Sequence, residues 1–209
     1  ITMSIRIHVN PASQHARRVR IAALELGLDV EWKIVDFATG AHQTPAYLAL
    51  NPHGKVPTLE EGNFVLWESN AIMTYLADKK PQSGLYPTDP MQRADINRWL
   101  FWESAHFGKA CITMTWERVV KPMFMKQATN EVLVADGEES YHRFAKILDG
   151  QLTNREYVAG RLSIADFALA SIMMYRAPAR IDTKPYPRIE QWLNRVEARD
   201  SWKQTQPQM

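Results

Sequence analysis

The first 35 residues follow two patterns of apolar spacing. Ile5, Ile7 and Val9 take every second position, which is typical of a half-buried β-strand. From residue 14, apolar side chains recur at i, i+3, i+4 and i+7, as on one face of a helix, and Gly27 follows as a stop signal. A second alternating run covers residues 30–34. Strand, helix and strand in this order predict a βαβ unit with parallel strands.

Residues 51–78 carry the longest ordered pattern. Glu61-Gly62-Asn63 separates a short apolar run over residues 56–59 from another over residues 64–66, which predicts an antiparallel hairpin. Apolar residues then recur at helical spacing, so a helix is expected to begin at or just after Glu68-Ser69. A βαβ unit followed by a hairpin and a helix predicts an α/β thioredoxin-like domain over residues 1–80.

The remaining chain is predicted to be helical. Residues 81–90 are rich in proline, glycine and polar side chains, so they predict a linker to an all-α domain over residues 91–209. Apolar spacing predicts one long helix that Pro122 closes, a helix over roughly residues 131–152 and a last amphipathic helix after residue 187. The tail from Gln204 is expected to be loosely held.

Composition narrows the classes of partner. Lys and Arg total 25 against 23 Asp and Glu, so charge gives no reason to expect nucleic acid or an anionic membrane. The single cysteine, Cys111, excludes an intrachain disulfide, and no spacing indicates a metal site. We interpret Cys111 as a core residue of the long helix, not a nucleophile.

The start of the chain lacks the basic region and apolar block of a signal peptide, and no run approaches the ~20 apolar residues of a membrane span. We therefore expect a cytoplasmic protein, with Met3 as its natural start. Further along, Ser163 and Asp166 stand three apart before an apolar run, which predicts a capping box and a structural role for Asp166.

The order of Pro57, the hairpin and Glu68-Ser69 at a helix start resembles the glutathione-binding half of the glutathione transferase superfamily. The resemblance implies a cis Val56–Pro57 bond and pairing of the Val56 backbone with the cysteinyl part of glutathione. It also implies that Glu68 and Ser69 hold the γ-glutamyl end and that Lys55 meets the glycyl carboxylate. A helix N-terminus favours anions, which suits a ligand with two carboxylates.

The segment from Ser13 to Arg17 resembles the Ser-Gln-x-x-Arg of theta-class transferases, and phi-class members also have a serine at this point. Glutathione reacts as a thiolate, but a free thiol with a pKa of about 8.5 is only a few per cent ionised at neutral pH. The resemblance implies that Ser13 stabilises this thiolate. A helix N-cap is the alternative role for Ser13, and Asn10 is the next candidate donor. His42 is placed like the glutathione-contacting histidine of those classes.

The resemblance further implies that the long helix borders a pocket for the electrophile. Four side chains on one stripe of that helix are candidates to line it, although packing or a solvated face explains them equally well: Arg98, Trp102, His106 and Trp116. A homodimer is also implied, with glutathione as co-substrate.

The leading hypothesis is a detoxifying transferase that adds the thiolate of glutathione to a hydrophobic electrophile. One alternative is a binding or stress-related protein that kept the fold and lost the chemistry. A glutathione-dependent thiol-disulfide reductase is a weaker alternative, because that activity normally requires a cysteine at the position of Ser13. The sequence does not identify the electrophile.

Overall fold

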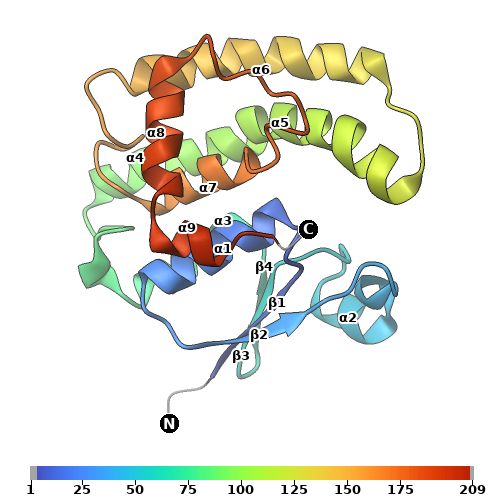
Figure 1. Cartoon of the computed structure of the whole chain (residues 1–209). Helices are drawn as coiled ribbons and strands as arrows, with labels where there is room; N and C mark the ends of the chain where they lie inside the picture. Colours follow the sequence, from blue (N-terminus) through green and yellow to red (C-terminus); the bar gives the residue numbers. More distant parts are fainter. Residues whose placement is uncertain (1–3, 208–209) are drawn as a thin grey trace. The chain divides into compact units, whose positions relative to one another are not determined.

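A computed structural model describes residues 4–207, so Met3 lies outside the described residues. The chain forms two compact units (Figure 1). The first contains the residues up to Tyr86 together with those from Arg199 on, and the second contains Pro87–Ala198. The predicted fold class, an α/β domain followed by helices, is confirmed.

The first unit is built on a four-stranded mixed sheet with the strand order β2-β1-β3-β4. β1 pairs in parallel with β2 and antiparallel with β3, and β3 and β4 form the antiparallel hairpin. Its elements are β1(Ile5–Val9), α1(Gln14–Glu25), β2(Val30–Ile34), η1(Ala41–Gln43), α2(Pro45–Leu50), β3(Thr58–Glu61), β4(Phe64–Trp67), α3(Ser69–Asp78) and η2(Pro81–Ser83).

The alternation along β1 separates an apolar face of the sheet from a polar one. Ile7 and Val9 are buried, and α1 and α3 lie together on one side of the sheet (Figure 1). The side chains of Arg6 and His8, which alternate with the apolar residues of β1, point to the other face of the sheet. There Arg6 Nε donates to Glu31 at 2.8 Å and His8 Nε2 lies 2.6 Å from a carboxylate oxygen of Glu60. The charges of that face are therefore largely paired across the strands.

The end of the described chain packs on α1. α9(Asp200–Gln204) contacts α1, and Arg17 donates to the carbonyl of Trp202 at 3.0 Å and to the hydroxyl of Thr205 at 3.4 Å. Thr205 is fully buried, so the prediction of a loose tail from Gln204 is wrong at this position. The sequence assigned residues 91–209 to the helical domain, whereas the contacts group the residues from Arg199 on with the first unit.

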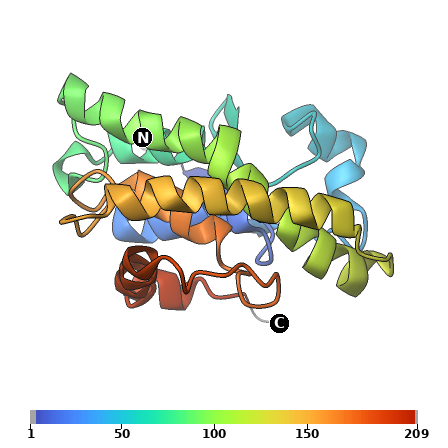
Figure 2. The same cartoon turned by 90° about the horizontal axis from the view of Figure 1, so that it is seen from above.

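The second unit is all-helical. Its elements are α4(Pro90–Trp102), η3(Glu103–Phe107), α5(Gly108–Thr115), η4(Trp116–Met125), α6(Glu131–Gln151), α7(Ile164–Ile172) and α8(Pro187–Glu197). α6 packs along α5 (Figures 1 and 2), and every residue of α7 is buried. Among residues 4–207, no helix has the length and apolar character to cross a membrane.

Residues 90–125 form one continuous helical rod with two wider, π-helical segments, η3 and η4. Pro122 lies inside η4, and the rod ends three residues later, before Lys126 in a left-handed conformation (φ 54°). The prediction that Pro122 closes the helix is therefore wrong. A proline ring clashes with the carbonyl four residues earlier in an α-helix, and the wider turn relieves that clash.

Asp166 is the polar centre of the helical unit. The predicted capping box with Ser163 is present, and the Asp166 carboxylate also accepts from Val158 N at 3.0 Å and Trp192 Nε1 at 2.9 Å. Complete burial raises the pKa of Asp166 to about 6, against the opposing effect of these donors. The side chain thus ties α7 to the preceding loop and to α8, in agreement with its predicted structural role.

We expect the stability difference between wild type and Asp166→Asn to shrink as pH rises from about 4 to about 6. The folded-state pKa of Asp166 is raised above its unfolded value, so ionisation opposes folding in this window, whereas the amide in the variant does not ionise. The change should reach about 3 kcal/mol, at 1.36 kcal/mol per pKa unit. Urea unfolding of both proteins across this range measures it. A difference that grows with pH would contradict the raised pKa.

Candidate functional site

A cavity of about 120 Å³ lies in the first unit at the N-terminus of α3. Its lining residues come from α1, from the loop before β3 and from the start of α3: His15, Asn51, His53, Lys55, Val56, Pro57, Glu68 and Ser69. Of the five glutathione-binding residues named from the sequence, the structure brings four to this cavity. His42 is the exception.

Hydrogen bonds fix the loop that carries Val56. The carbonyl of Lys55 accepts from the Tyr47 hydroxyl at 2.7 Å and from the Asn51 amide at 2.9 Å. Asn51 also donates to the Thr58 hydroxyl at 3.1 Å. The Val56–Pro57 bond is cis, as the resemblance implied, and β3 starts at Thr58. The backbone of Val56 consequently remains outside the β1–β3 ladder.

Glu68 joins the hairpin to α3 in an unusual backbone conformation. Its φ of 74° and ψ of 110° lie in a region that non-glycine residues rarely adopt and that costs about 1–3 kcal/mol. Within residues 4–207 its side chain makes no capping bond, whereas Ser69, the first helical residue, is buried. The first N–H groups of a helix lack intrahelical partners and carry partial positive charge. The cavity therefore combines a carboxylate, a hydroxyl and a helix end suited to an anion.

Ser13 caps α1, so the structural role that the sequence left open is present. Its Oγ accepts from Ala16 N at 3.2 Å, a bond that leaves the hydroxyl proton free to be donated elsewhere. Asn10, the alternative donor, uses its amide to hold the loop: Nδ2 donates to Val35 O at 2.9 Å and Oδ1 accepts from Ala12 N at 3.0 Å. This engagement favours Ser13 over Asn10.

His15 is a lining residue that the sequence did not single out. Its Nδ1 lies 3.5 Å from the Ser69 Oγ. The only sequence signal was its position, two residues after the N-cap Ser13, because it occupies a variable place of the Ser-Gln-x-x-Arg motif.

His42 lies on η1, beside the loop that carries Lys55. Its ring packs edge-on against Phe37 at 4.7 Å between centroids, and its Nδ1 is buried without a hydrogen-bond partner among residues 4–207. Gly54 has a φ of 59°, and a Cβ there would lie 3.0 Å from the His42 carbonyl and 2.7 Å from Gln43 Nε2. Only glycine allows the two segments to approach this closely.

The four candidates for the electrophile pocket separate within the second unit. Trp102 and His106 both contact the ring of Phe144, at 5.9 and 5.4 Å between centroids. Arg98 pairs with Asp95 at the surface, and Trp116 is 45% exposed. Because η3 interrupts the 3.6-residue period between Trp102 and α5, a stripe extrapolated from α-helical spacing does not stay on one face.

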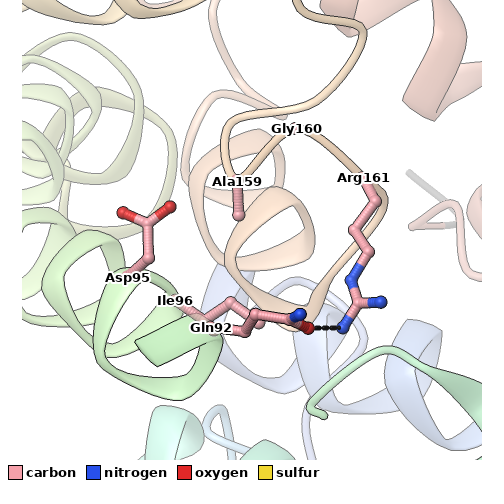
Figure 3. A pocket seen from close by; sticks show the side chains of 6 residues that line it. All are labelled: Gln92, Asp95, Ile96, Ala159, Gly160 and Arg161. Atoms are coloured by element: carbon pink, nitrogen blue, oxygen red, sulfur yellow. Dashed lines mark hydrogen bonds between the residues drawn. The ribbon is translucent and has the colours of Figure 1, made fainter. Parts of the chain in front are cut away.

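Two larger cavities lie in the second unit. One of about 320 Å³ between α5 and α6 is bordered by His106. The other, of about 270 Å³, lies between the start of α4 and the loop at Gly160, where Arg161 donates to the Gln92 amide (Figure 3). None of the residues predicted to bind glutathione lines either cavity.

Comparison with known proteins identifies the family. Residues 12–79 match the glutathione S-transferase N-terminal domain, and residues 112–200 match the C-terminal domain. Glutathione S-transferase PARB of Nicotiana tabacum is 30% identical, with 96% of each chain aligned. The chain belongs to the glutathione S-transferase family.

Two further members of this family are also similar to this chain in sequence or in structure. Human glutathione S-transferase theta-1 is 30% identical, over 94% of this chain and 83% of its own length. The theta-class glutathione S-transferase of Xanthomonas axonopodis pv. citri, solved with glutathione bound, has a TM-score of 0.88, 29% identity and 99% coverage of both chains. The resemblance drawn from Pro57 and Glu68-Ser69 is thereby confirmed.

We expect Gly54→Ala to destabilise the protein by more than Gly40→Ala. Both glycines have positive φ, 59° and 73°, so each alanine costs about 1 kcal/mol of backbone strain. Only at position 54 does the added methyl also meet the His42 backbone, and overpacking costs about 1–3 kcal/mol more. Urea unfolding of the pair measures the difference. Equal losses would mean that the His42 segment does not pack tightly on this loop.

Proposed function

We propose that this transferase adds the thiolate of glutathione to a hydrophobic electrophile, with glutathione in the α3 cavity and Ser13 as the donor to its sulfur. The observation that carries the proposal is the convergence of Lys55, Val56, Glu68 and Ser69 on one cavity. Family membership supports the same reaction class.

Each part of glutathione has a matching group in this arrangement. The Glu68 carboxylate pairs with the γ-glutamyl ammonium, and the Ser69 hydroxyl with the N-terminus of α3 receives the neighbouring carboxylate. The Val56 backbone, which lies outside the sheet ladder, pairs with the cysteinyl part as an added strand does. Lys55 pairs with the glycyl carboxylate, and His42, whose segment packs against Gly54 in the same loop, is a candidate for a further contact.

Ser13 supplies the chemistry at sulfur. Lowering a thiol pKa by two units requires about 2.7 kcal/mol of preferential stabilisation of the anion. A hydroxyl donor at the N-terminus of α1 is suited to provide it, because both the O–H and the helix end interact with negative charge. The sulfur lone pair then attacks the electrophilic carbon, and the displaced electron pair leaves with the leaving group or takes up a proton.

The pocket for the electrophile belongs to the same proposal. All four residues of the long helix remain candidates, and Trp102 and His106 stand ahead of Arg98 and Trp116 because they share the ring of Phe144. We also propose a homodimer located in the cytoplasm, with no nucleic-acid partner.

The reductase alternative loses its chemical basis. Cys111 is completely buried, and burial together with the nearby Glu103 carboxylate raises its pKa well above the usual range. A buried, protonated thiol does not take part in disulfide exchange. The other alternative is a binding protein without turnover. It differs from an enzyme in that Ser13 does not activate the sulfur of glutathione.

Ser69→Ala should raise the dissociation constant of glutathione about tenfold, because the γ-glutamyl carboxylate loses a charge-assisted hydrogen bond at a buried position. Titration calorimetry measures the constant. Thr39→Ala is the matched control, since this exposed hydroxyl donates locally to the Asp36 carbonyl. If both variants bind as wild type does, glutathione does not occupy the α3 cavity.

Ser13→Ala should leave glutathione affinity within a few-fold but cut turnover by about one to three orders of magnitude, the range for losing one preorganised donor. The thiolate pKa of bound glutathione, followed by ultraviolet titration, should rise by about one unit or more.

Ser13→Gly separates chemistry from capping. Glycine at an N-cap costs only a few tenths of a kcal/mol, whereas alanine costs about 1 kcal/mol. Both variants should therefore lose turnover alike, although only Ser13→Ala is appreciably less stable. An unchanged thiolate pKa in both variants would reduce Ser13 to a helix cap.

A further inference from the structure

His15 faces the cavity from the first turn of α1, and the proposed chemistry assigns it no task. α1 and α3 pack side by side, and their first turns meet where His15 Nδ1 lies 3.5 Å from the Ser69 Oγ. This separation is at the outer limit of a hydrogen bond. Two such groups suit a carboxylate that accepts one hydrogen bond from the hydroxyl and one from the imidazole.

We propose that His15, as an imidazolium, binds the γ-glutamyl carboxylate of glutathione together with Ser69, so that glutathione affinity falls as pH rises through the range where imidazoles titrate. This inference rests on the proposed function, which puts that carboxylate at Ser69. It adds a titrating residue to that end of the ligand.

The electrostatic setting explains why the ligand and the proton are coupled. Two helix N-termini, each bearing partial positive charge, flank His15 and disfavour a positive charge on its ring. A bound carboxylate reverses this preference, because an opposite charge at hydrogen-bond distance favours the protonated ring. Binding is therefore accompanied by proton uptake.

The other charged groups around His15 have partners or tasks of their own. On α1, Arg17 is directed to the Trp202 carbonyl on α9 and Arg18 donates to the Asn70 amide oxygen on α3 at 3.0 Å. In the cavity wall, Glu68 faces the ligand ammonium and Lys55 faces the glycyl carboxylate in the proposed function. The γ-glutamyl carboxylate is thus the anion assigned to His15.

His53 provides the matched control. It also lines the cavity, but its ring packs edge-on against Trp67 at 4.9 Å, and no contact joins it to Ser69 in the described part of the chain. Replacing either histidine with glutamine keeps a hydrogen-bonding side chain of similar length and removes the titration.

The experiment is titration calorimetry with S-methylglutathione between pH 5.5 and 7.5. The blocked sulfur removes thiolate formation, and any titration of the ligand itself is common to all proteins and cancels in the comparison. Wild-type affinity should fall about three- to tenfold across this range, with proton uptake detected by repeating the titration in buffers of different ionisation enthalpy. His53→Gln should keep both the pH slope and the proton uptake, whatever its absolute affinity.

His15→Gln should abolish both the slope and the proton uptake, and its affinity should approach that of wild type at pH 7.5. Thermal unfolding checks that the variant is folded, and His15→Asn serves in its place if it is not. A slope that persists in the His15 variant, or disappears in His53→Gln, would overturn the assignment. Binding that is independent of pH in wild type would overturn this inference alone, whereas no binding at any pH would overturn the proposed function as well.

Discussion

The carbonyl of Lys55 is the point on which the site depends. Tyr47 and Asn51 both donate to it, and Thr58 is bonded to each of them, so one buried cluster connects α2, the loop and β3. Burial raises the pKa of Tyr47, partly offset by the bond to Thr58, which keeps the phenol protonated and able to donate. Because this cluster fixes the residues before Pro57, the Val56 backbone is presented at the cavity instead of joining the sheet.

The remaining walls of the cavity come from two helix starts, and their charge explains the ligand class. α1 and α3 both direct partial positive charge toward the same space, and neither has an acidic residue in its first turn to offset it. Glu68 stands one residue earlier, in a strained conformation that leaves its side chain exposed beside Ser69. A zwitterionic ligand with carboxylates and an ammonium satisfies this arrangement better than a neutral one.

Local patterns predicted most of the fold, and the family resemblance implied four of the cavity residues. Period-two alternation at Ile5, Ile7 and Val9, the turn at Gly62 and the Ser163 capping box depend on neighbours in sequence. What the sequence could not show depends on long-range contacts or on irregular backbone. The packing of Thr205 on Arg17 joins residues 188 positions apart, and the π-helical turns carry no periodicity of their own. The position of His15 at the cavity also depends on a long-range contact, the packing of α3 beside α1.

Two groups that act on different parts of the ligand respond to pH in opposite directions. The protein's own thiol is buried at Cys111, so the reactive sulfur belongs to glutathione, and its thiolate fraction rises with pH. In the inference above, an imidazolium at His15 holds the γ-glutamyl carboxylate, and its contribution falls with pH. Because the two groups act on different atoms of one ligand, their effects multiply in kcat/KM, which then passes through a maximum between the two titrations. A site in which only the glutathione thiol titrated would show only the rising limb.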